Sequence, residues 1–220
     1  MSEPWLLYAV PGWGSVLAEA MLAWCGVPCR IEDVEGFDRE GPARDRLIAV
    51  NPLAQLPTLV LPDGTVMTES AAIALLLAER HPDAGLAPPP DAAERPAFLR
   101  RLVWLAASVY PTFTYGDYPE RWAGGAAEAL RAAALAHRKR LWRTFEAELA
   151  AGPAPGFQPG PWVLGERFSA LDIHVCAMTR WRPGRAWFAA SCPRLTAVAE
   201  RADGLPRLAP VWARNVAATD

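Results

Sequence analysis

The sequence has few cysteines, a single lysine and no long apolar run. Cys25, Cys29, Cys176 and Cys192 are the only cysteines among 220 residues. This sparse use indicates free thiols in a reducing compartment rather than a disulfide framework. No stretch approaches the ~20 consecutive apolar residues that a membrane-spanning helix needs. The opening MSEPWLLYAV has an acid and a proline where a secretory signal has basic residues. We therefore expect a cytoplasmic protein with no membrane partner.

The chain also lacks a surplus of positive charge. Its formal net charge is −2, so the composition gives no reason to expect nucleic acid or an anionic membrane as a partner. With 52% hydrophobic and 21% charged residues, the composition is that of an ordinary globular protein. A chain of 220 residues can form one large domain or two small ones.

The first third of the chain alternates strand and helix patterns. WLLYAV (5–10) predicts a buried strand ended by Pro-Gly, and a helical pattern then runs from Ser15 to a stop at Gly26. PCRIEDVE (28–35) predicts a second strand, parallel to the first. A short irregular helix is expected around 42–49.

A hairpin and a helix follow. TLVL (58–61) and TVMT (65–68) predict two antiparallel strands joined by a Pro-Asp-Gly turn. Residues 71–81 predict a helix that is apolar almost all round, and we expect it to be largely buried. The order up to residue 81 is β-α-β-α-β-β-α.

The strand signal disappears after a proline-rich segment. We expect domain boundaries at 1–82 and 92–220, with residues 83–91 as the linker. The C-terminal part predicts only helices, with a loop at 151–161 and further helices near the ranges 169–181, 193–202 and 206–215. The predicted fold class is thus an α/β domain followed by an all-α domain.

No metal site is expected. His174 and Cys176 could share a metal ion, but a zinc site needs three or four protein ligands and no others are near. His174 is interpreted as a hydrogen-bonded core histidine. Ser169 and Asp172 have the spacing of a capping box, which serves folding.

Three motifs in this order resemble the cytosolic glutathione transferases: NPLAQLP (51–57), TES (68–70) and SALD (169–172). The resemblance covers essentially the whole chain. It implies a thioredoxin-like N-terminal domain, an all-helical C-terminal domain, a homodimer, and glutathione as co-substrate. The implied activity is attack of the glutathione thiolate on a small apolar electrophile, as in detoxification, or glutathione-dependent reduction of a peroxide or disulfide.

The resemblance also implies how glutathione is held. Pro57 would follow a cis bond, and the main chain of Leu56 would pair with the extended peptide. Glu69 and Ser70, at a helix start, would hold the charged γ-glutamyl end. The alternatives are a proline that simply starts a strand, and an ordinary helix N-terminus.

Two further residues are candidates for the glutathione site. Gln55 occupies a position where family members often have a side chain that contacts the glycyl carboxylate. Trp13 could line the mouth of the site. An exposed loop residue is the alternative for each. Ala54 departs from the family's usual glycine, which puts the loop geometry in question.

Two side chains are candidates for the group that activates the thiol. PGWGS (11–15) resembles the bacterial form Pro-Gly-x-Cys-Ser, but Gly14 replaces the cysteine. A mechanism through that cysteine is therefore disfavoured. Ser15 is the best remaining donor, with a plain N-cap as the alternative. Tyr8 is the second candidate, with a core strand residue as the alternative.

Aromatic residues after the first C-terminal helix could form the acceptor pocket. In the family this region faces glutathione, and Tyr110, Phe113 and Tyr115 would contact the electrophile. The alternative is that they fill the core of a kinked helix. Two other functions stay open for the whole chain: a non-catalytic glutathione- or ligand-binding protein, and a protein-docking member of the family.

Overall fold

The computed structural model describes residues 4–152 and 159–216, which form two compact units. One unit runs to Leu86 and also takes in the C-terminal segment from Asp203. The other extends from Ala87 to Ala202. The boundaries proposed from the sequence differ, because they place all of 92–220 in the helical domain. The last helix instead groups with the first unit, so each unit is described by itself.

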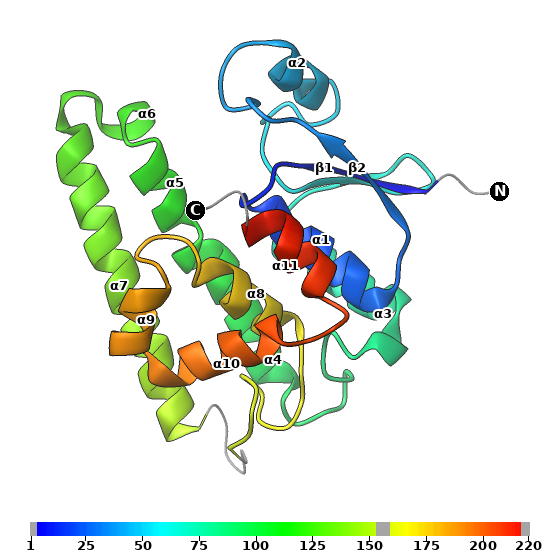
Figure 1. The fold of residues 1–220 in the computed structure, drawn as a ribbon, viewed down its shortest axis with the longest axis vertical. Helices are drawn as coiled ribbons and strands as arrows, with labels where there is room; N and C mark the ends of the chain where they lie inside the picture. Colours follow the sequence, from blue (N-terminus) through cyan, green and yellow to red (C-terminus); the bar gives the residue numbers. More distant parts are fainter. Residues whose placement is uncertain (1–3, 153–158, 217–220) are drawn as a thin grey trace. The chain divides into compact units, whose positions relative to one another are not determined.

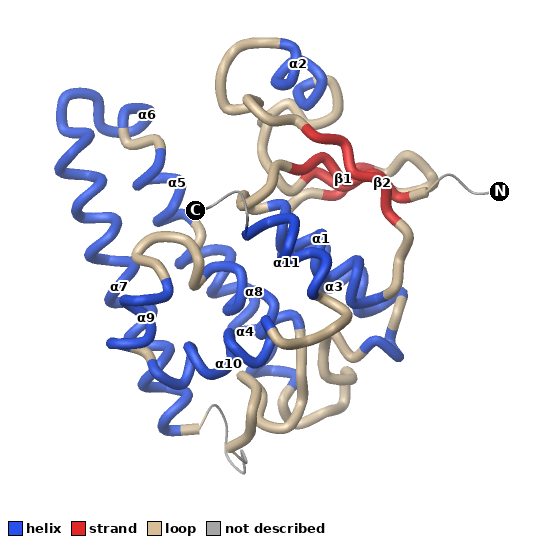
Figure 2. The backbone as a smooth tube through the Cα atoms, viewed as in Figure 1, coloured by secondary structure: helices blue, strands red, loops and turns tan. Residues whose placement is uncertain are grey.

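The first unit contains a mixed four-stranded sheet in the order β2-β1-β3-β4 (Figure 2). Its strands are β1 (Trp5–Ala9), β2 (Cys29–Asp33), β3 (Thr58–Val60) and β4 (Val66–Met67). The β1–β2 pair is parallel, whereas β1–β3 and β3–β4 are antiparallel. This arrangement confirms the thioredoxin-like β-α-β-α-β-β-α domain that the sequence predicts.

Helices cover both faces of this sheet (Figure 1). They are α1 (Ser15–Cys25), α2 (Pro42–Ile48), α3 (Ser70–Arg80) and, from the C-terminal segment, α11 (Ala209–Val216). Leu7 and Ala9 of β1 are fully buried on the face that α1 packs against. Because side chains alternate along a strand, Tyr8 and Val10 point to the opposite face, where α2 lies.

The core on the α2 face is a small apolar cluster, called here the α2 cluster. Its buried members are Val10, Val34, Phe37, Leu47 and Ala54. The side chains of Tyr8, Ala43 and Leu56 are partly buried against it. The α2 cluster therefore joins the end of β1, the loop before β3 and helix α2 into one packed body.

Helix α3 is less buried than its composition predicts. Only Ser70, Ile73, Ala74 and Leu77 are buried, and the other positions are half-buried or exposed. These four follow the three- and four-residue spacing of a single helix face. The expectation of a largely buried helix was wrong because only one face is buried, which leaves Leu75 and Leu76 half-buried together with several alanines.

Asn51 holds the loop before β3 in shape. Its side-chain oxygen accepts from the N–H of Leu53 (3.1 Å), and its amide nitrogen donates to the carbonyl of Gln55 (3.2 Å) and to Thr58 Oγ1 (2.9 Å). The Thr58 hydroxyl also donates to the Gln55 carbonyl, at 2.7 Å. Asn51 is only 5% exposed, so these contacts replace water for buried polar groups.

The described residues of the second unit form helices and loops, with two isolated β-bridges, Trp162–Gly165 and Leu164–Arg167. Its α-helices are α4 (Arg95–Trp104), α5 (Pro111–Asp117), α6 (Glu120–Ala123), α7 (Ala127–Ala151), α8 (Ala170–Met178), α9 (Arg185–Ser191) and α10 (Pro193–Asp203). A π-helical segment, Leu105–Val109, links α4 to α5. Every residue of α8 is buried. The sequence analysis missed α9, and part of the loop expected at 151–161 lies outside the described residues.

The start of α8 is fixed by the predicted capping box. Ser169 Oγ accepts from the N–H of Leu171, and Asp172 Oδ2 accepts from the N–H of Ser169. Burial raises the pKa of Asp172 to about 7. His174 is also buried, and its Nδ1 lies 2.8 Å from the Ala170 carbonyl. A carbonyl can only accept, so Nδ1 carries the proton.

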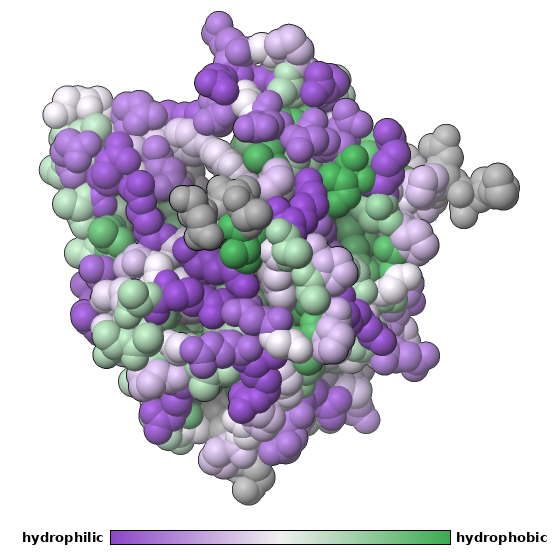
Figure 3. Space-filling view, viewed as in Figure 1, coloured by the Kyte–Doolittle hydropathy of each residue, from purple (hydrophilic) through white to green (hydrophobic). Residues whose placement is uncertain are grey.

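The surface and the cysteines agree with the composition. Hydrophilic residues make up most of the face drawn in Figure 3. The cysteines are free, as expected. Across the described residues, no helix has the length and apolar character needed to cross a membrane.

We predict that His174→Gln makes the protein less sensitive to acid. Burial lowers the pKa of His174 to about 4 from the ordinary 6.5, so the unfolded chain takes up the proton first. This contribution to stability is full above pH 6.5 and is lost as the pH falls toward 4. In urea titrations, wild type should lose up to about 3 kcal/mol more than the variant over that range. His137→Gln, at an exposed position on α7, should behave like wild type. Parallel pH profiles for wild type and His174→Gln would contradict the prediction.

We predict that Asn51→Ala lowers the free energy of unfolding by about 2 kcal/mol, because it removes hydrogen bonds to the buried Thr58 hydroxyl and to two partly buried main-chain groups. Asp63→Ala is the matched control. Asp63 also caps a turn, accepting from the N–H of Thr65 at 2.9 Å, but it is exposed. Its replacement should cost less than about 1 kcal/mol. Equal losses in urea unfolding would contradict the prediction, because the burial of Asn51 would then add nothing to the contribution of its hydrogen bonds.

Candidate functional site

The β3–β4 hairpin brings two predicted parts of the site together. Leu59 pairs with Met67 and Val60 with Val66. The ladder ends at the Leu59–Met67 pair, with Leu56 three residues before Leu59 and Ser70 three residues after Met67. Directly opposed residues in an antiparallel pair have Cα atoms roughly 5 Å apart. The hairpin thus sets the loop before β3 beside the start of α3.

Leu56 offers its main chain for pairing. The Leu56–Pro57 bond is cis, as the resemblance implies. Within the described residues, neither the N–H nor the carbonyl of Leu56 has a hydrogen-bond partner. Its side chain is half-buried against the α2 cluster, which fixes the residue in place. A free donor and acceptor on one anchored residue can pair with an extended peptide.

Glu69 and Ser70 form the start of α3. Glu69 is exposed and has φ +60°, a conformation that disfavours a residue with a side chain. Such local strain is often found at binding sites. Ser70 is 7% exposed. The first N–H groups of this helix carry partial positive charge, which suits a carboxylate.

The loop before β3 carries Ala54 and Gln55. Ala54 has φ +48°, which explains why the family usually has glycine there. The Gln55 side chain is exposed, while its carbonyl is held by Asn51 and Thr58. Asn51 was not singled out from the sequence, although asparagine before proline is a common turn signal.

The Ser15 hydroxyl is already engaged. It donates to the Val10 carbonyl and accepts from the Val10 N–H, both at 3.1 Å. Ser15 is fully buried. The N-cap of α1 is Gly14, so Ser15 is not the plain N-cap that the sequence left open. The pair with Val10 closes the turn between β1 and α1.

The Tyr8 hydroxyl is not engaged. Within the described part of the chain it has no hydrogen-bond partner, and its ring is partly buried against the α2 cluster. Tyr8 pairs with Thr58 in the β1–β3 ladder, so its side chain lies on the same face as that of Leu56. This placement brings a free phenol to the face that carries the loop before β3.

Neither cysteine of the first unit can replace the cysteine that related loops have at the position of Gly14. Burial raises the pKa of Cys25 to about 11 and that of Cys29 to about 11. A thiol with such a pKa is protonated near neutral pH and is a poor nucleophile. Thiol chemistry in this unit therefore needs an external thiol.

A cavity of about 370 Å³ lies beside the loop that carries Trp13. Its lining consists of Val10, Pro11, Trp13, Glu35, Gly36, Phe37, Asp38 and Arg39. Trp13 is 38% exposed and packs edge-on against Phe37, with ring centroids 5.1 Å apart. Arg39 was missed in the sequence because it lies in a charged loop without a motif. The lining carries the Trp13 indole, one cation (Arg39) and two carboxylates (Glu35 and Asp38), so its charge does not favour an anionic ligand.

The three predicted pocket residues of the second unit do not form one surface. Tyr110 and Phe113 pack edge-on with Trp181. Phe113 is 6% exposed and lies under the Arg138 guanidinium, 3.7 Å from it. Tyr115 is 37% exposed and pairs with Trp122 instead. Phe113 is thus a core residue, while Tyr115 faces solvent.

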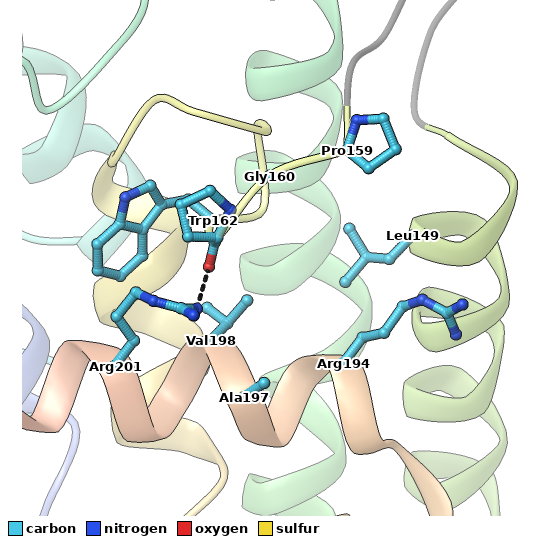
Figure 4. Close-up of a pocket in the computed structure, with 9 residues that line it drawn as sticks. Leu149, Pro159, Gly160, Trp162, Arg194, Ala197, Val198 and Arg201 are labelled. Atoms are coloured by element: carbon cyan, nitrogen blue, oxygen red, sulfur yellow. Dashed lines mark hydrogen bonds between the residues drawn. The ribbon is translucent and has the colours of Figure 1, made fainter.

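The second unit has a cavity of its own, of about 460 Å³ (Figure 4). Arg194, Val198 and Arg201 of α10 face Trp162 and Leu149 across it. None of the predicted site residues lines it. Arg201 donates to the Pro161 carbonyl at 2.7 Å, and Arg194 lies 3.6 Å from Glu146 Oε1. Both guanidinium groups therefore have partners, and no ligand is assigned to this cavity.

Comparisons with known proteins agree with this geometry. Residues 18–80 match the family model of the glutathione S-transferase N-terminal domain. An uncharacterised GST-like protein of Escherichia coli K12, YncG, is 44% identical over 95% of this chain and 97% of its own length. Glutathione S-transferase GstA of Escherichia coli O157:H7 is 28% identical over 80% of this chain and 81% of its own.

Solved structures give the same result. A glutathione transferase from Methylococcus capsulatus has a TM-score of 0.77 at 28% identity, covering 97% of this chain and 99% of its own. A sphingomonad glutathione S-transferase, solved in complex with glutathione, has a TM-score of 0.76 at 26% identity over 96% of this chain and 98% of its own. Glutathione is the co-substrate of this family. The full-length match to the K12 relative and the matched N-terminal domain show that this chain belongs to the glutathione S-transferase family.

Proposed function

We propose that this protein binds glutathione in its first unit and presents it as a thiolate. The reaction is attack on a small apolar electrophile, or reduction of a peroxide or disulfide. The observation that carries the proposal is the unpaired main chain of Leu56, in the loop before the β3–β4 hairpin that leads on to Ser70. A peptide laid along Leu56 would reach the start of α3 with its charged end.

Each predicted residue takes one part of glutathione in this proposal. The main chain of Leu56, held by Pro57, pairs with the cysteinyl unit. The Glu69 carboxylate pairs with the ammonium group, and Ser70 with the α-carboxylate at the helix N-terminus. Gln55 reaches the glycyl carboxylate, and the exposed edge of Trp13 borders the site.

Of the two candidate catalytic side chains, Tyr8 has the hydroxyl that is free to donate. A serine has a single O–H, and that of Ser15 is used by Val10. We therefore assign Tyr8 to stabilisation of the thiolate and Ser15 to the shape of the loop. A hydroxyl aimed at the sulfur lowers the pKa of the thiol and increases the thiolate fraction at neutral pH.

The electrophile is proposed to be apolar and to contact the aromatic residues of the second unit. Tyr110, with Phe113 behind it in the core, is proposed for this contact on one surface, and Tyr115, which pairs with Trp122, on another. On the resemblance alone, we also propose a cytoplasmic homodimer that acts in detoxification. A glutathione-binding protein without catalysis is the second candidate, because Gly14 and the engaged Ser15 remove the family's usual donors from the loop.

We predict that Glu69→Ala and Ser70→Ala each weaken glutathione binding about 10-fold or more, because each removes a charge-assisted contact. Calorimetric titration measures this. Glu79→Ala, at the exposed far end of α3, should bind like wild type. Glu69→Gly should bind as weakly as Glu69→Ala but be about 1 kcal/mol more stable, since glycine tolerates φ +60°. Unaltered affinity in both alanine variants would refute the proposed site.

We predict that Tyr8→Phe lowers kcat/KM for an aryl halide about 100-fold at neutral pH. The pKa of the bound thiol should rise toward ~8.5 in this variant. Ser15→Ala should leave that pKa unchanged and lower the free energy of unfolding by about 1–2 kcal/mol, because the Val10 groups lose their partner. Ultraviolet titration of the thiolate separates the two effects. A raised thiol pKa in Ser15→Ala, with normal stability, would show that serine contacts the sulfur.

A further inference from the structure

The last helix of the chain contacts the loop between β1 and α1. Asn215 of α11 is 3% exposed, and its Oδ1 accepts from the N–H of Gly12 at 3.0 Å. Its amide nitrogen donates to Glu19 Oε2 (3.1 Å) and to the Val211 carbonyl (2.9 Å). One side chain thus links the loop to α1 and to its own helix, although Gly12 and Asn215 are 203 residues apart.

The contacted loop borders the proposed glutathione site. Gly12 lies between Pro11 and Trp13, and both of these neighbours line the 370 Å³ cavity. Gly12 has φ +79°, so its N–H direction is set by a turn that glycine permits. The Trp13 N–H donates to the Val10 carbonyl at 3.2 Å. The loop is therefore held at Val10 by one set of bonds and at Gly12 by Asn215.

The carboxylate of Glu19 on α1 holds the Asn215 side chain in place. Glu19 accepts from Arg214 at 2.5 Å as well as from Asn215. The Glu19 side chain is 11% exposed, and the Arg214 side chain 29%. Burial raises the pKa of Glu19, while the hydrogen bonds from Asn215 and Arg214 oppose this rise. The donors and the acceptor of the Asn215 amide are all used, so the residue has one orientation.

We propose that Asn215 is a positioning residue for glutathione, acting through Gly12. Its hydrogen bond sets the loop so that Trp13 and the cavity are shaped before the ligand arrives. Affinity for glutathione then depends on a helix that contributes no ligand contact. This inference rests on the proposed glutathione site, and it extends that site to the opposite end of the chain.

The test compares two residues of α11 that both bind Glu19. Asn215→Leu keeps the branched shape and the number of side-chain heavy atoms but loses the bond to Gly12, whereas Arg214→Gln weakens only the contact with Glu19. We expect Asn215→Leu to raise the Kd for glutathione about 10-fold. Arg214→Gln should stay within about 2-fold of wild type at a comparable loss of stability. Equal affinities in the two variants would overturn the proposal.

A second experiment exchanges the hydrogen-bond donor and acceptor between positions 215 and 19. Asn215→Asp alone keeps an acceptor for the Gly12 N–H, but it places a second carboxylate against that of Glu19. Combined with Glu19→Gln, it restores a donor–acceptor pair and the original net charge. The double variant should bind glutathione within about 2-fold of wild type and the single variant more weakly. Equally weak binding by the single and double variants contradicts the proposal, and this comparison decides if Asn215→Leu does not fold. Wild type that fails to bind glutathione would instead refute the proposed function.

Discussion

The antiparallel pairing of β3 with β4 is the constraint on which the proposed site depends. The two strands are short, and the turn between them is closed by hydrogen bonds between Leu61 and its partners Thr65 and Gly64. Gly64 has φ +83°, which this turn requires. Since the register of a hairpin follows from its turn, the pairing of Leu59 with Met67 is fixed, and both Leu56 and Ser70 lie three residues from that pair.

Buried polar contacts hold the rest of the site. Asn51 shapes the loop before β3, the Ser15 hydroxyl closes the turn after β1, and Asn215 holds Gly12. Each is a neutral side chain whose hydrogen bonds are satisfied within the first unit. The loop that carries a cysteine in related bacterial proteins is here a glycine loop fixed by its neighbours. Reactivity must then come from the external thiol and the groups aimed at it.

Local signals were sufficient for most of the first unit. The apolar run WLLYAV marked β1, and Gly26 ended α1 in the left-handed conformation expected of a C-cap. The capping box at Ser169 and Asp172 was also readable, because its geometry spans only four residues. The predicted glutathione residues stay predictions, but the structure places them on one hairpin and one helix start.

Other features could not be predicted from short stretches of the sequence. The one-sided burial of α3, the hydrogen-bond state of Ser15 and the packing of Phe113 depend on neighbours distant in sequence. Arg39 lies in a loop whose charges have no pattern, and Asn215 lies in an ordinary amphipathic helix. The sequence by itself determined the order of elements, the turns and the family motifs, because hydrophobic periodicity and backbone preference act over a few residues. Only the tertiary structure decided which hydroxyl is free and that α11 supports the loop after β1, because hydrogen-bond partners are chosen by packing.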